Sequence, residues 1–146
     1  PSTISSLTEE FGFAVLFTDR GLLHWPVTER PVKATEGIKM SAIAFVNAVV
    51  GGLGSCDQAG LLRAVRYASL SSVPDRAIFY VSDGGGTCST PSEDAYWRET
   101  IDAVTAANNG TARLHSIQVN GGSQAAEAFM RELAEKNGGT FHQVDL

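Results

Sequence analysis

The sequence predicts a single three-layer α/β sandwich with a mostly parallel central sheet, one antiparallel edge strand and helices on both faces. Three observations predict it. Strand-like apolar segments alternate with segments of helical periodicity along the 146 residues. The segment "RAIFYVS" (76–82) is almost continuously apolar, which is typical of a central strand covered on both faces in a parallel sheet. No repeat or low-complexity linker divides the series, so one domain is expected over 1–146.

The N-terminal elements are predicted to be a hairpin followed by two helices. "FGFAVLFT" (11–18) is rich in aromatic and β-branched residues and ends at a turn, after which "LLHWPVT" (22–28) is again extended. Pro26 cannot donate a ladder hydrogen bond, so the second strand is expected at the sheet edge. Helical spacing then follows in 38–49 and in 61–68, on either side of a glycine-rich loop.

The C-terminal elements are predicted from caps and apolar stripes. "TPSE" indicates Thr90 as the N-cap of a helix whose buried stripe contains Trp97, and this helix ends near "NNG". "ARLHSIQV" (112–119) is typical of a strand. A helix capped by Ser123 then ends before Gly138, and "TFHQVDL" forms a last strand.

Charge and hydropathy exclude several classes of function. Eleven basic residues against sixteen acidic ones give a net charge of -5, without the basic patch that would bind a phosphate backbone, so no nucleic-acid partner is expected. The longest apolar stretches are too short to cross a bilayer, and no secretion signal opens the chain. We therefore expect no membrane insertion of this chain.

The most informative polar residues follow the predicted central strand and the glycine-rich loop. In parallel sheets ligands collect beyond the carboxyl ends of the strands, where Asp83 is expected. The loop "GGLGSCDQ" (51–58) would bring the Ser55 hydroxyl and the Asp57 carboxylate to the same crevice. Oxygen ligands suit a hard cation such as Mg²⁺. The alternative interpretation makes Ser55 or Asp57 a helix N-cap and lets Asp83 bond turn amides.

The remaining reactive side chains have structural interpretations. His24, His115 and His142 lie singly on strand-like segments, where a structural role is expected. Cys56 and Cys88 are either inert thiols or, if both loops meet at the top of the sheet, a disulfide. Closing that loop would add roughly 3 to 4 kcal/mol to the stability.

Taken together, these segments resemble the von Willebrand factor type A domain, a Rossmann-like fold. The resemblance rests on "FAVLFT", on "GSCDQAGLLRAV" entering a helix, on "AIFYVSDGG", and on "LHSIQVN" followed by "FMRELAEKNGGTFHQV". It implies a metal-ion-dependent adhesion site built from three loops. Ser55 stands at the family's threonine position and Asp83 at its third-loop aspartate, so these two residues are the expected Mg²⁺ ligands.

Two features of the family are missing from this sequence. The Asp-x-Ser-x-Ser motif after the first strand is absent, and Asp19 in "LFTDRGLL" is not a substitute, so metal affinity is expected to be weak. The first strand itself, central in the family's sheet, is absent as well. Because an open inner position would leave two rows of backbone groups unpaired, we expect an N-terminally incomplete domain. An N-terminal fragment or a second chain would then supply the central strand.

The resemblance favours a non-enzymatic function. The leading hypothesis is an adhesion or scaffold module that recognises a protein ligand at the top of the sheet, through a divalent metal. A metal-free structural domain with a degenerate site is the alternative, and a doubly wound hydrolase that uses Asp83 is a third. The family and the candidate disulfide favour a secreted or extracytoplasmic location.

Overall fold

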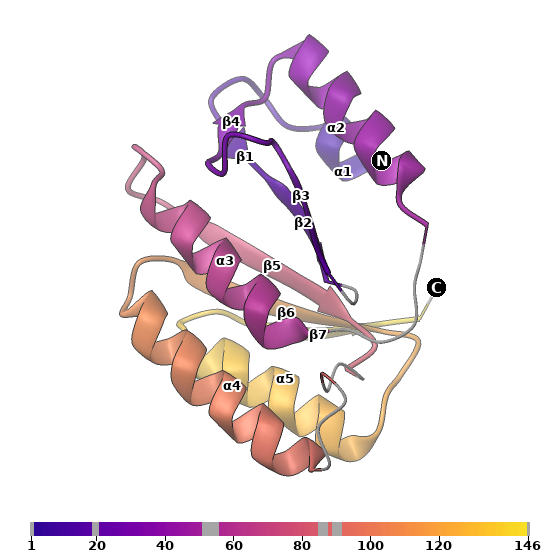
Figure 1. Ribbon diagram of the computed structural model, residues 1–146, viewed down its shortest axis with the longest axis vertical. Coiled ribbons are helices and arrows are strands. Elements are labelled where there is room, and N and C mark those ends of the chain that lie inside the picture. Colours follow the sequence, from indigo (N-terminus) through magenta and orange to yellow (C-terminus); the bar gives the residue numbers. More distant parts are fainter. Residues whose placement is uncertain (1, 19–20, 51–55, 85–87, 89–91, 146) are drawn as a thin grey trace.

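The computed structural model describes residues 2–18, 21–50, 56–84, 88 and 92–145. The predicted order, two strands and two helices followed by strand, helix, strand, helix and strand, is observed, together with three further short elements in the N-terminal part (Figure 1). Their bounds are α1 (Ser2–Ser5), β1 (Gly12–Phe13), β2 (Val15–Thr18), β3 (Leu22–Trp25), β4 (Val32–Lys33), α2 (Glu36–Ala48), α3 (Asp57–Ser69), β5 (Ala77–Ser82), α4 (Glu93–Asn108), β6 (Arg113–Val119), α5 (Gln124–Lys136) and β7 (Phe141–Val144).

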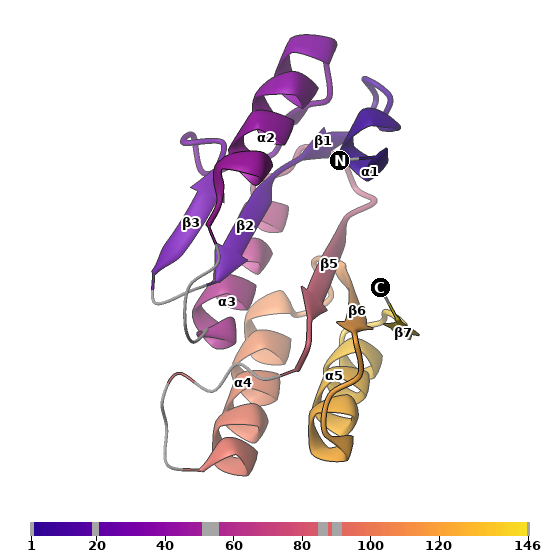
Figure 2. The same cartoon turned by 90° about the vertical axis from the view of Figure 1, so that its right-hand side faces the viewer.

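The described strands form three separate hydrogen-bonded groups. β5, β6 and β7 make a parallel sheet in that order, with Ala77 opposite Arg113 and Ser116 opposite Phe141. β2 and β3 form the predicted antiparallel hairpin, and β1 pairs with β4. In Figure 2 the strands follow one another across the molecule as β3, β2, β5, β6 and β7, so the hairpin continues the parallel sheet without being paired to it.

Helices lie on both sides of these strands. α4 and α5 contact each other, and α3 contacts α4 on one side and both β2 and β5 on the other. The opposite face of the hairpin is covered by α2, where the Phe17 and Phe45 rings lie 5.9 Å apart. The expected α/β architecture, with a parallel sheet, an antiparallel edge strand and helices on two faces, is confirmed.

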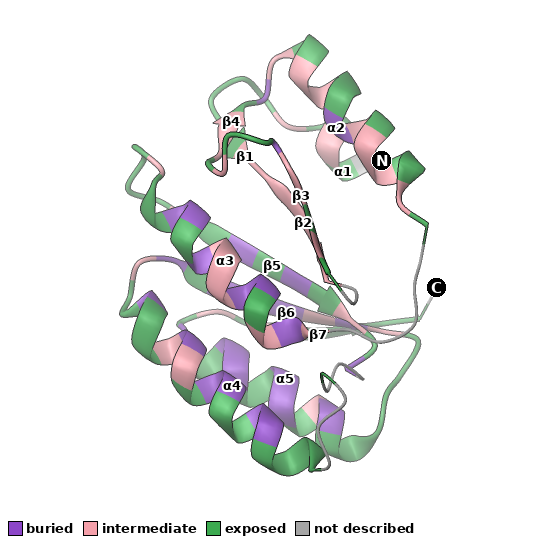
Figure 3. Ribbon diagram, in the orientation of Figure 1, coloured by how far each residue is buried: buried purple, intermediate pink, exposed green. Residues whose placement is uncertain are grey.

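The apolar core lies between the parallel sheet and the layer formed by α3, α4 and α5 (Figure 3). Leu114, Met130 and Leu133 have no exposed surface, and the predicted stripe residue Trp97 stacks on Phe129 at 5.5 Å. Full burial of a side chain of this size contributes about 1.5 to 3 kcal/mol. This half of the molecule therefore holds most of the packing energy.

The expectation that 76–82 is a central strand covered on both faces is wrong for the described residues. Ile78 and Tyr80 are buried against the helices, whereas Phe79 and Val81 are 66% and 57% exposed. β5 pairs with β6 alone among the described strands, so it is an edge strand, and the helices of the core pack on the face of Ile78 and Tyr80. Its outer face is apolar without a cover.

Helix caps follow the prediction at α5 and differ from it at α4. Ser123 accepts a hydrogen bond from the Ala126 amide at 3.1 Å, as expected of an N-cap. At α4 the N-cap is Ser92, which accepts from the Ala95 amide, and not Thr90. Thr90 itself lies outside the described residues. The error is a shift of the helix start from Thr90 to Ser92, two residues whose hydroxyls can both cap.

Candidate functional site

Asp83 lies directly after β5, at the carboxyl end of the parallel sheet, and is exposed. The turn that follows it is tightly packed. Gly84 adopts φ +87, and its amide donates to the Ser82 hydroxyl at 3.0 Å. A Cβ on Gly84 would lie 2.6 Å from the Ala126 Cβ, so only glycine fits there. The glycine after Asp83 thus allows the β5 strand end to pack against the start of α5.

A buried glutamine supports the same turn from β6. Gln118 has no exposed surface, and its Nε2 donates to the Asp83 carbonyl oxygen at 3.4 Å. Gln118 is not among the site residues that the sequence predicts. The only signal for it was its position near the end of a predicted strand beside the one that carries Asp83.

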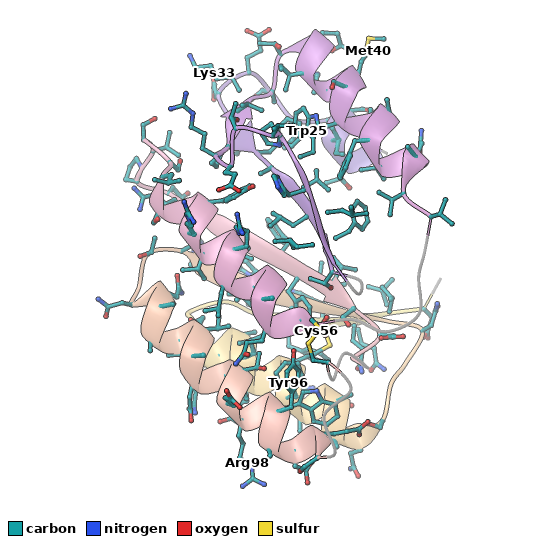
Figure 4. All side chains as sticks on the ribbon, viewed as in Figure 1. Trp25, Lys33, Met40, Cys56, Tyr96 and Arg98 are labelled. Carbon is teal, nitrogen blue, oxygen red and sulfur yellow. A yellow bond between two sulfur atoms is a disulfide. The ribbon has the colours of Figure 1, made fainter. Side chains whose placement is uncertain are left out.

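The two cysteines form a disulfide, which Figure 4 shows next to the N-terminus of α3. Cys56 is the N-cap residue of α3, Cys88 follows the Asp83 turn, and their Cα atoms are 4.5 Å apart. Of the two interpretations of the cysteines, the bridge is the one observed. It joins the loop that precedes α3 to the loop that follows β5, which are the two loops expected to build the site. Ser55, the residue before Cys56, lies outside the described residues.

Asp57 does not offer its carboxylate to a ligand and is not an N-cap, which corrects both interpretations of this residue. It is the first residue of α3 and is only 2% exposed. Its Oδ1 accepts a hydrogen bond from the Thr18 hydroxyl at 3.1 Å, and its Oδ2 accepts one from the Tyr80 hydroxyl at 2.6 Å. A buried carboxylate requires such donors, because an unpaired one would be costly to desolvate. Asp57 therefore ties the end of β2 to β5.

Tyr80 is held in its protonated, hydrogen-donating form. Burial, and secondarily the neighbouring charge of Asp57, raise the pKa of the Tyr80 phenol well above its ordinary value of 10.0. A deprotonated Tyr80 would place two negative oxygens side by side in the interior. At neutral pH the phenol is consequently a permanent donor to the Asp57 carboxylate.

The N-terminus of α3 is also occupied by a protein group. The Gln58 amide, in the first turn, donates to the Tyr96 hydroxyl of α4 at 3.1 Å, so one of the free amides of this helix end is satisfied from within the fold. Tyr96 is labelled in Figure 4, beneath the disulfide.

The described residues supply few ligands for a metal ion. Among them there is no cluster of three or more histidine, cysteine or acidic side chains that could hold one. Of the expected ligands, Asp83 is the one that the structure describes, and the nearby Asp57 carboxylate is already bonded to two hydroxyls. Mg²⁺ is bound through six oxygens, so the described residues alone fit it poorly.

The three histidines have hydrogen-bond partners in the fold. His24 Nδ1 lies 2.9 Å from the Tyr67 hydroxyl. His115 and His142 both contact the Thr140 hydroxyl, at 2.9 and 3.0 Å. These contacts agree with the structural role expected for them.

Comparison of the structure with solved proteins identifies the fold. A von Willebrand factor type A protein from Catenulispora acidiphila superposes with a TM-score of 0.79 at 18% identity, over 97% of this chain and 31% of that chain. The chain has a von Willebrand factor type A fold. An aerotolerance-related membrane protein from Bacteroides fragilis NCTC 9343 superposes with a TM-score of 0.68 at 13% identity, over 97% of this chain and 75% of that chain.

The von Willebrand A fold thus rests on structure, since no family model and no curated protein sequence matches the chain. The chain spans about a third of the length of the Catenulispora protein. Within the fold, the site differs from the expected adhesion site because the sequence lacks the Asp-x-Ser-x-Ser motif. Asp83 is at the expected strand end.

Proposed function

We propose that this von Willebrand A-like domain is a protein-interaction module, of the adhesion or scaffold type, that binds a protein ligand at the rim beside Asp83. One observation carries the proposal: the Cys56–Cys88 disulfide joins the start of α3 to the chain that follows β5, at the carboxyl end of the sheet where Asp83 is exposed. A covalent link between two segments lowers the conformational entropy that they lose on binding. The proposal assigns no catalytic reaction to the chain.

A divalent metal is the finer part of this proposal. Ser55 and Asp83 would contribute oxygens to Mg²⁺ or Mn²⁺, and a carboxylate of the ligand would complete the coordination. Affinity for the metal should be weak, because two protein oxygens leave most of the octahedron to water. A metal-free domain is favoured by a specific observation, the use of the Asp57 carboxylate inside the fold.

Titration calorimetry distinguishes the two forms of the proposal. Mg²⁺ and Mn²⁺ are titrated into the wild type, the Asp83→Ala variant and an Asp75→Ala control, and sodium acetate then serves as the simplest carboxylate ligand. Asp75 is an exposed aspartate that precedes β5. Heat that is lost in Asp83→Ala alone supports the metal site. No heat of binding in the wild type supports the metal-free form of the module. Equal heat in all three proteins contradicts a metal site at Asp83.

The proposal also includes a cellular location and a polypeptide segment that completes the sheet. A disulfide is typical of an oxidising compartment, which supports a secreted or extracytoplasmic location. No helix in the described ranges is long and apolar enough to cross a bilayer. A polypeptide segment, from an N-terminal fragment or a second chain, is proposed to complete the sheet between β2 and β5.

A further inference from the structure

A cavity lies at the amino ends of β5 and β6, at the opposite end of the sheet from Asp83 (Figure 1). It is lined by 74–76 before β5, by 105 and 108–113 between the last turn of α4 and the start of β6, and by 136–138 at the end of α5. Its volume of about 520 Å³ is typical of cavities that hold small organic molecules. We call it the Arg76 cavity.

The lining of the Arg76 cavity is basic, although the chain as a whole is acidic. Arg76, Arg113 and Lys136 line it, and among the described lining residues Asp75 is the one acidic side chain. The whole chain, in contrast, has a net charge of -5. Basic side chains gathered around a cavity create a positive potential inside it, which favours a ligand of negative charge.

Arg76 is held in place without being neutralised. Its half-buried side chain donates from Nε to the Val73 carbonyl at 2.7 Å and from Nη2 to the Ser71 carbonyl at 3.0 Å. No acidic side chain in the described part of the chain forms an ion pair with it. An oriented guanidinium with free N–H groups binds carboxylate and phosphate groups through directed hydrogen bonds.

The other two basic side chains are paired with acids at the surface. Arg113 Nη2 lies 2.6 Å from Asp75 Oδ1. Lys136 Nζ lies 2.9 Å from Glu132 Oε1. The four side chains are 46% to 83% exposed, and ion pairs of such exposure contribute little to stability. A bound anion can therefore compete for either cation.

Two buried asparagines fix the shape of the Arg76 cavity. Asn108 at the end of α4 and Asn137 after α5 are 1% and 6% exposed. Asn108 Nδ2 donates to Asn137 Oδ1 at 2.9 Å and to the Ala112 carbonyl at 2.8 Å. Asn137 Nδ2 donates in turn to the Thr105 hydroxyl at 3.0 Å. These bonds join α4, α5 and the start of β6, so the cavity is formed without a ligand and little has to be ordered on binding.

The ends of α4 and α5 act against an anion, because the carboxyl end of a helix carries a partial negative charge. This effect falls off within the last turn, and terminal carbonyls are bonded within the fold, as the Thr105 carbonyl is to the Asn109 amide at 3.0 Å. Arg76 and Arg113 belong to the starts of β5 and β6 and not to a helix. The anionic group is therefore expected at the strand side of the cavity.

We propose that the Arg76 cavity binds a small organic molecule that carries an anionic group, a carboxylate or a phosphate. Arg76 holds this group, and Arg113 and Lys136 supply further positive charge. The Thr111 hydroxyl and the Asn109 side chain make no hydrogen bond to another described residue, so they are available to the polar remainder of the ligand. This small-molecule site is separate from the rim and adds to the proposed protein-interaction role.

NMR titration of the 146-residue chain, with each backbone amide observed separately, tests the proposal. The probes are citrate and glucose 6-phosphate at constant ionic strength, with glucose as the neutral control. At least one of the two probes should shift the amide signals of Gly110, Thr111 and Gly138, which line the cavity, with a dissociation constant on the order of 1 mM. The probe that binds more tightly assigns the anionic group as a carboxylate or as a phosphate.

Two variants and a matched control make the test specific. Arg76→Gln should weaken binding roughly tenfold, because it removes charged hydrogen bonds to the ligand. Lys136→Gln removes a more exposed cation and should weaken binding roughly threefold. Arg98→Gln should leave binding unchanged, because Arg98, labelled in Figure 4, is an exposed residue of α4 that does not line the cavity.

Several results would overturn the proposal. One is that neither probe shifts the three signals, and another is that glucose shifts them as strongly. Acetate and inorganic phosphate that bind as tightly as the larger probes would contradict an organic ligand. Equal binding by the wild type and the Arg76→Gln and Lys136→Gln variants would contradict the site. If Arg76→Gln fails to fold, the comparison of Lys136→Gln with Arg98→Gln decides.

Discussion

The two halves of this domain differ in how completely they bury their apolar residues. In the C-terminal half, α4, α5 and β6 contribute fully buried side chains such as Val104, Leu114 and Leu133. In the described part of the first 50 residues, the buried apolar side chains in the core are those of Ala34 and Ala42, and β2 is half-buried throughout. The comparison teaches that the N-terminal half has little core of its own and depends on α3 and on the hydrogen bonds from Thr18 and Tyr80 to Asp57.

The largest expected difference between the halves comes from matched leucine truncations. Leu133→Ala should lower the free energy of unfolding by about 2 to 5 kcal/mol, because it leaves a cavity in the C-terminal core. Leu16→Ala, in half-buried β2, should cost about 1 kcal/mol, because less apolar surface is removed from contact. Urea unfolding of both variants measures the two values. Equal losses would contradict the proposed difference between the halves.

The disulfide should give the next largest effect, because it joins the start of α3 to the loop after β5. Its cysteines are 32 residues apart, and replacing both by serine should lower stability by about 3 to 4 kcal/mol in the chain-entropy model. The wild type in reducing buffer serves as a second version of the same change. An unfolding midpoint that is identical with and without the bridge would contradict this role.

The hydrogen bond from Tyr80 to Asp57 should make stability depend on pH in the alkaline range. Tyr80→Phe removes a donor from a buried carboxylate and should cost about 1 to 3 kcal/mol at neutral pH. The raised pKa of Tyr80 means that the native state holds this proton more tightly than the unfolded state. Its stabilisation is therefore complete below pH 10.0 and is lost as the pH rises from there towards the native pKa.

Urea unfolding at about pH 8 and about pH 11 measures this dependence. The wild type should lose more stability between the two values than Tyr80→Phe does. Thr18→Val, which removes the other donor but keeps Tyr80, should retain the alkaline loss. A wild-type stability that stays constant over this range would show that Tyr80 titrates normally.

The smallest effect that still separates the halves is expected at the helix caps. Ser123 caps α5 through its side chain, so Ser123→Ala should cost about 1 kcal/mol. Thr35 is the N-cap residue of α2 but makes no side-chain cap hydrogen bond, so Thr35→Ala should cost a few tenths of that or less. Thermal unfolding by circular dichroism can resolve the two. A larger loss for Thr35→Ala would contradict the assigned caps.

Most of the fold could be predicted from local patterns. Helical spacing and the Ser123 cap predicted α5, and aromatic and β-branched residues on either side of a turn predicted the hairpin, because these signals lie within a few residues of one another. The role of Asp57 could not be predicted in this way. Its partners, Thr18 and Tyr80, are 39 and 23 residues distant, and only the packed fold brings them together.

The misjudged strand is instructive for a different reason. The apolar run of β5 predicted cover on both faces, and the structure provides it on one. Phe79 and Val81 are residue types that are usual in a buried strand, but both side chains are exposed. The sequence pattern thus predicts burial on two faces, and the described residues bury one of them. For the rim, the strand end predicted Asp83, whereas the supporting Gln118 had no local signal.

Native-state hydrogen exchange of the isolated chain tests the central claim most directly, because it measures the opening free energy of each half separately. Amides in α4, α5 and β6 should exchange only through openings close to the global free energy of unfolding. Amides in α2 and in the β2–β3 hairpin should exchange through openings that require clearly less free energy. The same opening free energy for both halves would show that the N-terminal half has a complete core of its own.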